Sequence, residues 1–455
     1  MKKFSSLLLV ILIIVIPILS GMAFPAKMTD AREKKAVIRI ETEPNLEIHE
    51  GYVSQKEETV LVKKGRKTIA RVYLSEPVVV AQAEQEEKWG YFQFPSIGKA
   101  EDGTLIVSWQ MKDDSPKTYG VKSEIHNTPM MSKDGGRTWL PQDKEYERFV
   151  KGYNVVMSDG SKLQVNTPKA KDIKSYNTFP RPVVKEENGV YFLENSLPKD
   201  LQGVYFNYQK PGEIVKTIHA TLNDPGLVRA ATDNLLPVVW WGNIEQLKDL
   251  SLVAGVYPCD YFSDGGGLIK GCVSFYRSTD YGKSWTVIGK ILPDSTSYAR
   301  KSKWDEDGFS EPAFEIIADS TFICVMRTGM TAPMYRSFSY DLGSSWTKTE
   351  AFTPNGVKPK LLKLSNGILV LASGRPGIQL RFSVDGKGRD WTEPIEMMPY
   401  MNGDGSFTRD VSCGYASLLK EGEDSFYLVY SDFNKQNKHG EIRKSILCRK
   451  ISIKK

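Results

Sequence analysis

Apolar residues in this chain of 455 residues come in short runs, and polar residues that favour turns separate the runs. In a repeated unit, a proline precedes a small turn residue by about eight positions, and an apolar run such as 104–107 follows the turn at once. Runs of this length between turn residues predict β-strands, and no amphipathic pattern of useful helical length lies between them. Six units follow the pattern, beginning at Pro95, Pro180, Pro225, Pro312, Pro359 and, without the proline, Tyr415. The chain is therefore predicted to be all-β.

A second pattern, out of phase with the first, is the motif Ser-x-Asp-x-Gly followed by Trp. It occurs four times, at 132–139, 278–285, 339–346 and, with one extra residue, 383–391. Its residue types suit a hairpin turn. Asp accepts hydrogen bonds from nearby backbone N–H groups, Gly adopts positive φ, and Trp packs the turn onto the adjoining strand. The motif is expected in the second hairpin of the units that carry it.

Four-stranded units repeated at this spacing are typical of propeller blades, which protect their edges by standing around a central axis. We therefore predict a six-bladed β-propeller over residues 86–455, whose second and sixth blades lack the motif. Residues 24–85 form a stretch of their own, with strands predicted at 37–40 and 59–62. This stretch is predicted to be a small N-terminal β extension. The alternative is that it supplies a strand that closes the last blade.

The N-terminus has the features of a secretory signal peptide. Lys2 and Lys3 form a positive region, residues 7–19 are apolar, and residues 21–23 offer a small-x-small cleavage site. The apolar stretch is too short for a comfortable membrane span. We therefore predict that residues 1–23 are a signal peptide, that no membrane span remains after cleavage, and that the protein is secreted or periplasmic. An uncleaved anchor is the alternative.

The composition is that of an ordinary globular protein, with 40% hydrophobic and 25% charged residues. The net charge of +6 is small for this length, and the lysines are scattered, which argues against a nucleic-acid partner. The five cysteines show no metal-ligand spacing, and the four histidines form no cluster with them. A metal site is therefore not expected.

The turn motif, its four copies and the six units together resemble the sialidase (neuraminidase) superfamily, in which this motif is known as the Asp box. The resemblance covers roughly residues 88–450. It implies a Tyr nucleophile activated by a Glu, an Asp that acts as acid and base, and three Arg residues that hold the carboxylate of the substrate. It also implies net retention of anomeric configuration, and no cofactor.

Four residues are similar in context and order to the residues of that family: Tyr415 as nucleophile, Glu311 as its activating base, and Arg327 and Arg375 as carboxylate ligands. Planar guanidinium groups bind a carboxylate through two parallel hydrogen bonds. The carboxylate of a sialic acid would repel an attacking Asp or Glu, whereas a neutral Tyr hydroxyl avoids the repulsion and a Glu takes its proton. Each residue alone has an ordinary explanation as a strand residue, but their joint placement favours a substrate pocket.

The sequence departs from the family pattern at several points. Gln93 stands where the first Arg is expected, and a neutral donor weakens anion binding by roughly 1 kcal/mol or more. Asp114 is the candidate acid/base, although its polar loop suits a solvated turn equally well, and Glu124 is the alternative. Arg229 or Arg181 is a candidate to supply a positive charge from another direction.

The resemblance thus predicts an exo-glycosidase that removes terminal sialic acid, or a related acidic 2-keto sugar, from glycoconjugates. The expected substrate ligands are Arg327, Arg375, Gln93 and Arg229. Aromatic residues at 240–241 and 257–261 are candidates to stack on a sugar face, or else pack in the core. Two alternatives remain: a propeller glycosidase for another sugar, and a non-catalytic propeller that binds glycan or protein.

Overall fold

The computed structural model describes residues 38–42, 53–112, 115–120, 128–143, 146, 153–187, 189–293, 305–329, 332–375, 377–399 and 410–455. Strands make up nearly all of the regular structure of this part, and the few helical elements are single 3-10 turns. The predicted all-β class is confirmed. The signal segment 1–23, Asp114 and Glu124 lie outside the described residues. None of the helical turns within the described ranges is long and apolar enough to cross a lipid bilayer.

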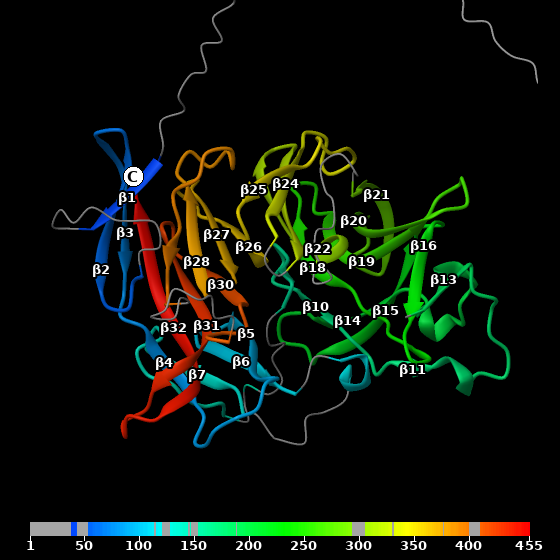
Figure 1. Ribbon diagram of the computed structural model, residues 1–455, viewed down its shortest axis with the longest axis horizontal. Coiled ribbons are helices and arrows are strands. Elements are labelled where there is room, and N and C mark those ends of the chain that lie inside the picture. The colour runs from blue at the N-terminus through cyan, green and yellow to red at the C-terminus, as the bar shows by residue number, and fades with distance from the viewer. Residues whose placement is uncertain are drawn as a thin grey trace, which may run out of the picture. The chain divides into compact units, whose positions relative to one another are not determined.

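Three four-stranded antiparallel sheets follow the chain in simple order, strand beside successive strand (Figure 1). The first contains β5 (Tyr91–Lys99), β6 (Leu105–Met111), β7 (Met130–Ser132) and β8 (Leu140–Pro141). The second contains β22 (Asp305–Ala318), β23 (Thr321–Gly329), β24 (Met334–Ser339) and β25 (Glu350–Thr353). The third contains β26 (Val357–Lys363), β27 (Leu369–Gly374), β28 (Ile378–Ser383) and β29 (Ile395–Glu396).

The C-terminal sheet is completed by strands from the N-terminal part of the chain. It contains β30 (Ala416–Glu421), β31 (Ser425–Gln436) and β32 (Ile442–Lys454), and β4 (Val78–Gln82) pairs with the first half of β32. The second half of β32 pairs with β3 (Lys67–Leu74), which continues into β2 (Glu58–Lys64) and β1 (Ile38–Thr42). Residues 37–455 accordingly form one compact unit.

Two further four-stranded groups belong to one larger sheet. One contains β9 (Val155–Val156), β10 (Lys162–Asn166), β14 (Val204–Gln209) and β15 (Lys216–Asn223). The other contains β18 (Trp241–Gln246), β19 (Leu252–Phe262), β20 (Leu268–Ser278) and β21 (Ser284–Ile291). Parallel pairing of β15 with β21 joins the two groups.

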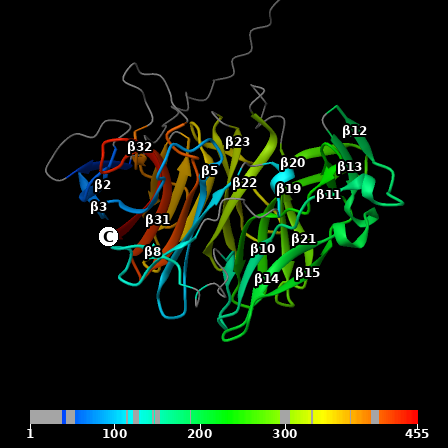
Figure 2. The same ribbon diagram turned by 90° about the horizontal axis from the view of Figure 1, so that it is seen from below.

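The units predicted to start at Pro180 and Pro225 were placed wrongly. Their strands, β13 (Gly189–Leu193) and β17 (Leu235–Leu236), lie outside the four-stranded groups. β13 pairs with β12 (Val184–Glu186) and with β16 (Leu227–Ala231), which joins the larger sheet at β19. β17 pairs with β11 (Lys171–Asp172) in a sheet of two strands. Figure 2 shows β11, β12 and β13 together beside β20 and β21. The sequence pattern of a turn followed by an apolar run is the same for these strands as for the strands of the four-stranded groups, because both depend on the same local alternation.

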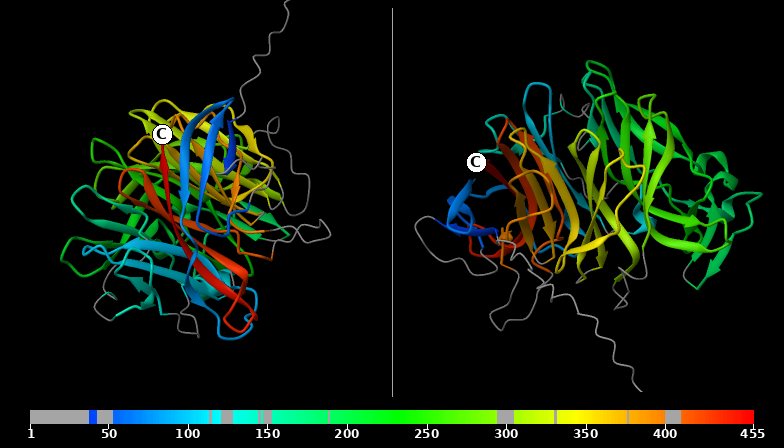
Figure 3. Two further views of the ribbon diagram at one scale, coloured as in Figure 1. Left: turned by 90° about the vertical axis from the view of Figure 1, so that its left-hand side faces the viewer. Right: turned by 90° about the horizontal axis from the view of Figure 1, so that it is seen from above.

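The first strands of successive groups lie next to one another. β5 packs against β30, β30 against β26, β26 against β22, β22 against β18, and β18 against β9. The red, orange, yellow and green sheets therefore succeed one another in Figure 3. Aromatic side chains fill the space between neighbouring sheets, as where Phe275 of β20 and Phe314 of β22 meet with ring centroids 5.5 Å apart. Residues on these first strands are far apart in sequence and close in space.

The Ser-x-Asp turns have the geometry predicted for them, and each joins the third and fourth strands of its group. In the second copy, Asp280 accepts hydrogen bonds from the backbone N–H groups of Lys283 and Ser284. Trp285 donates from its indole nitrogen to the carbonyl of Gly282 at 3.1 Å, and φ of Gly282 is 82°. The other three copies repeat the bond from the Trp indole to the Gly carbonyl. The turns thus complete their own hydrogen bonding.

Candidate active site

Three first strands carry the same backbone irregularity, and it positions the site. Phe94 on β5, Glu311 on β22 and Lys358 on β26 each precede a proline and have φ of 51°, 47° and 45°. Each lies where the pairing with the second strand of its sheet shifts register. Such a bulge bends a strand and re-aims a side chain, and positive φ in a residue with a side chain is costly. The bulges bring one side chain from each strand to the same place.

Tyr415 and Glu311 form the centre of the site. The hydroxyl of Tyr415, just before β30, donates a hydrogen bond to Oε1 of Glu311. The guanidinium of Arg327, near the end of β23, lies 3.2 Å from the same oxygen, and the backbone N–H of Lys358 donates to Oε2 at 2.9 Å. The side chain of Glu311 is only 3% exposed, so both of its oxygens are bound within the protein.

The surroundings decide the charge of these two groups. Burial alone would raise the pKa of Glu311, but the charges of Arg327 and Lys358, with the hydrogen bonds from Tyr415 and from the backbone of Lys358, hold it below its usual value. Burial and the charge of Glu311 raise the pKa of Tyr415 well above the usual range. At neutral pH the site therefore contains an ionised carboxylate beside a protonated phenol. A proton on the phenol has an acceptor already in place.

Arg375 lies close to this pair. Its Nη2 donates to the carbonyl of Cys413 at 3.5 Å, whereas its buried Nε contacts no acceptor among the described residues. Burial lowers the pKa of Arg375, and the nearby charge of Arg327 lowers it further. The backbones of Gly374 and Gly414 meet so closely that a Cβ on Gly374 would lie 1.8 Å from the carbonyl oxygen of Gly414. That approach brings Arg375 beside the strand of Tyr415.

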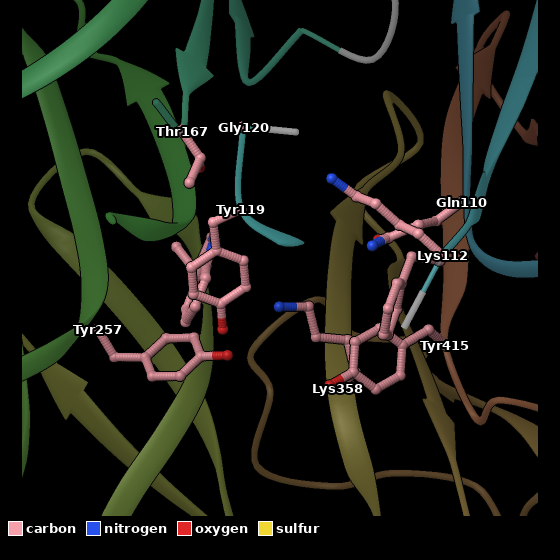
Figure 4. A pocket seen from close by; sticks show the side chains of 10 residues that line it. Gln110, Lys112, Tyr119, Gly120, Thr167, Tyr257, Lys358 and Tyr415 are labelled. Atoms are coloured by element: carbon pink, nitrogen blue, oxygen red, sulfur yellow. The ribbon is translucent and has the colours of Figure 1, made fainter. Parts of the chain in front are cut away.

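A pocket of about 430 Å³ opens next to Tyr415 (Figure 4). Its lining residues are Phe94, Gln110, Lys112, Tyr119, Gly120, Thr167, Trp241, Tyr257, Lys358 and Tyr415. Tyr119 and Tyr257 face Lys358 and Tyr415 across it. Trp241 lies between the two tyrosines, 5.6 Å from each by ring centroid. Aromatic walls of this kind suit the apolar faces of a sugar ring.

Of the aromatic residues expected at the pocket, Trp241 and Tyr257 line it. Trp240 does not, because its side chain is 1% exposed and packs in the core against Phe206 and Trp285. Successive residues of an extended strand point to opposite faces, which sends adjacent tryptophans to different surroundings. The sequence pattern could not decide which of the two faces the pocket.

None of the four residues expected to bind substrate is among the lining residues of this pocket, although Arg327 and Arg375 lie close to Glu311. Gln93 is 2% exposed, and Phe94, re-aimed by the bulge, occupies the pocket wall instead, with its ring centroid 4.7 Å from that of Tyr415. Arg229 is bound into the fold. Its Nε pairs with Glu194 at 2.7 Å, and its Nη1 and Nη2 donate to the carbonyls of Val239 and Gly203. A buried guanidinium with these partners stabilises the fold and is not free to hold a ligand.

Lys358 lines the pocket and was not identified from the sequence. Its ammonium lies 5.4 Å from the ring centroid of Tyr415 and 5.6 Å from that of Tyr257. A signal was available: Lys358 precedes the proline of its unit, as Glu311 does. Lys360, two residues further along β26, is half-buried, and burial together with the charge of Lys358 lowers its pKa to about 8. No group of three potential metal ligands occurs within the described residues.

No protein-family model matches this chain, and no curated protein matches it. Among solved structures, a protein of unknown function from Dyadobacter fermentans is similar, with a TM-score of 0.55 and 18% identity over 84% of this chain and 99% of that chain. A Hadza microbial sialidase has a TM-score of 0.48 and 16% identity, over 87% of this chain and 74% of its own. An α-L-arabinanase from Penicillium chrysogenum has a TM-score of 0.42 and 16% identity, over 82% and 98%. At these identities the likeness concerns the fold alone.

Proposed function

We propose that this protein is a glycoside hydrolase, built as a six-bladed propeller, that removes a terminal sialic acid or a related acidic 2-keto sugar from glycoconjugates. One observation carries the proposal. A tyrosine at the edge of an aromatic-walled pocket donates a hydrogen bond from its hydroxyl to a buried carboxylate, which two cationic residues keep ionised. A buried structural tyrosine also commonly donates to a polar partner, as Tyr276 does to Asp224 at 2.8 Å. Tyr415 differs because it lines a pocket that a substrate can enter, and a nucleophilic tyrosine requires a base beside it. We further propose that the protein acts outside the cytoplasm, as its N-terminal segment predicts.

In the proposed reaction, the oxygen of Tyr415 attacks the anomeric carbon and its proton passes to Glu311. The bond from the anomeric carbon to the leaving oxygen breaks, and that oxygen takes a proton from an acid, for which Asp114 remains the sequence-based candidate. Water then attacks the anomeric carbon, giving up a proton to the conjugate base of that acid, and the bond from this carbon to the oxygen of Tyr415 breaks. Tyr415 recovers its proton from Glu311, and the sugar leaves with its original anomeric configuration. A neutral phenol suits a substrate whose anomeric carbon bears a carboxylate, since it does not repel that charge.

Arg327 and Arg375 are the proposed carboxylate ligands. The guanidinium of Arg327 contacts Glu311 through Nη1, and the Nε of Arg375 is a buried donor to which no described residue presents an acceptor. A carboxylate between the two groups would supply that acceptor and lessen the repulsion of the two charges. The apolar Phe94 in the wall of the pocket favours the second candidate, a glycosidase for another sugar, because the family-like cation is missing there.

A panel of fluorogenic aryl glycosides, with mass detection of the released sugar, tests the proposal. The panel should contain the α-glycoside of a sialic acid and neutral pentosides and hexosides. We expect turnover of the sialoside, and a loss of at least about a thousandfold in kcat for Tyr415→Phe with an unchanged melting temperature. A fluorinated activated glycoside, which slows the second step, should label Tyr415 in peptide mapping. If the protein releases only a neutral sugar, the second candidate function, a glycosidase for another sugar, is supported instead. If it cleaves no glycoside of the panel, the proposed function is wrong.

A further inference from the structure

The three proline-associated bulges give three different side chains to one site. β22 contributes the carboxylate of Glu311, β5 the ring of Phe94, and β26 the ammonium of Lys358. Because these positions share the same backbone conformation and the same shift in strand pairing, they are equivalent places in the fold. The first cation of the site was expected from β5, but β5 supplies the aromatic ring of Phe94. The cation at the equivalent position is Lys358 on β26.

Lys358 takes part in the site through two separable groups. Its backbone N–H holds Oε2 of Glu311 at 2.9 Å, which no substitution of its side chain removes. Its side chain extends into the pocket, where the ammonium stands near the rings of Tyr415 and Tyr257 (Figure 4). Contact with two aromatic faces orients the ammonium within the pocket.

The charges around Tyr415 favour an anion. Among the described residues close to its hydroxyl, Glu311 is the carboxylate that bonds to it, and Arg327, Lys358 and Arg375 are the cations whose charges act on Glu311 or on one another. These four groups are one carboxylate and three cations. Lys112 also lines the pocket. In a partly enclosed pocket, a cation beside the ligand strengthens the binding of a negatively charged group.

We propose that Lys358 is a specificity-determining residue that binds the carboxylate of an acidic sugar through its ammonium. In this role its ammonium replaces the first Arg of the expected carboxylate ligands, which β5 does not provide. The inference rests on the proposed function for its substrate, and it adds that the recognition of the acid depends on a lysine of β26. The ammonium is near enough to the phenol of Tyr415 to meet a carboxylate borne by the carbon under attack.

Lys358→Met and Lys358→Arg separate the charge from the backbone contact. We expect Lys358→Met to raise KM for the sialoside about 10- to 100-fold with kcat within about threefold, which is the range for losing one charged contact, and Lys358→Arg to recover most of the loss. With the methyl ester of the same sialoside, whose carboxylate is masked, wild type and Lys358→Met should differ by less than about threefold. Equal losses on the acid and on its ester would overturn the proposal and leave Lys358 a structural role. No loss on either would overturn it as well.

Lys360→Met is the matched control, because it makes the same change on the same strand at a residue that does not line the pocket. We expect it to leave KM within about threefold. Binding distinguishes failure of this inference from failure of the proposed function. A 2,3-unsaturated sialic acid, titrated by calorimetry into Tyr415→Phe with and without Lys358→Met, should bind at least about tenfold more weakly when Lys358 is replaced. An unchanged affinity would overturn the role of Lys358, whether or not wild type cleaves any glycoside.

Discussion

The Ser-x-Asp turns and the proline-associated bulges lie at opposite ends of the sheets, and they differ in what is repeated. In the turns the side chains recur: Ser, Asp and Trp make the same bonds in each copy. In the bulges the backbone recurs while the side chains differ, as Phe94, Glu311 and Lys358 do. In the turn at Asp341, for example, the backbone N–H of Leu342 donates a hydrogen bond to the carbonyl of Ser320. Ser320 follows the end of β22, so this turn lies away from Glu311.

The difference distinguishes structural repetition from functional repetition. A turn that completes its own hydrogen bonds and buries its Trp stabilises whichever sheet carries it, so identical residues serve every copy. A bulge at the first strand re-aims one side chain toward the same pocket, so different residues there combine into one site. Substitutions in the turns should therefore change stability and spare the chemistry, and those in the bulges should do the reverse.

The largest effect is expected for the bulge on β22. Glu311→Gln should lower kcat by about a thousandfold or more on every substrate that wild type cleaves, because an amide cannot accept the proton of Tyr415. The measurement is steady-state kinetics on protein whose folded fraction is known from its melting curve. The pKa of Glu311 lies below its ordinary value of 4.5, so kcat/KM of wild type should not fall on its account until the pH drops below about 4.5. Retention of more than a tenth of kcat in the variant would contradict the assignment.

The turn at β20 should respond in the opposite way. Trp285 is almost fully buried and packs against Phe206 and Trp240. Trp285→Ala should lower the free energy of unfolding by about 3–4 kcal/mol, as large-to-small substitutions in a packed core do. Denaturant unfolding measures the loss, and kcat per folded molecule should stay within about twofold. A large fall in kcat with intact stability would show that the turns are not confined to a structural role.

Trp241→Ala tests a tryptophan of the pocket, for comparison with Trp285 in the core. Trp241 is half-buried and contacts Tyr119 and Tyr257, so its removal should cost less stability than the loss of Trp285. We expect KM to rise several-fold, in line with about 1 kcal/mol for a lost aromatic contact. Trp241→Phe should restore most of the affinity. Kinetics of the three proteins on one glycoside would check this, and an unchanged KM in Trp241→Ala would remove the residue from the binding wall.

The smallest effect concerns Lys360, beside the bulge on β26. Burial lowers the pKa of Lys360 to about 8, below that of an exposed lysine. Between about pH 8 and 10, Lys360 is therefore still protonated in the unfolded chain but has lost its proton in the folded chain. The contribution of Lys360 to stability therefore rises with pH across this range. Lys360→Met should be more stable than wild type at pH 7 by about 1 kcal/mol, with allowance for solvent screening of a half-buried group, and the advantage should shrink toward pH 10. Thermal unfolding at both pH values measures the difference, and an equal advantage at both would exclude titration as its cause.

Part of the candidate site can be predicted from local patterns. Residue type and order along the chain predict Glu311, Arg327, Arg375 and Tyr415, and the structure brings these four residues close together. Lys358 was missed, because a lysine before a proline is an ordinary surface residue unless the pairing of its strand is known. The sequence predicts Gln93 as a substrate ligand, whereas the structure places Phe94 at the pocket, because the bulge that turns Phe94 inward depends on the pairing of β5 with β6.

By itself, the sequence determined the strands, the hydrogen-bonded turns and the all-β class, since these depend on neighbours within a few positions. The packing of the whole chain settled which strands complete which sheet: β4 joins β32, and the strands after Pro180 and Pro225 lie outside the four-stranded groups. It also decided which side chains share the pocket and that Arg229 serves the fold. Those outcomes depend on burial and charge among residues hundreds of positions apart, which local propensity does not encode.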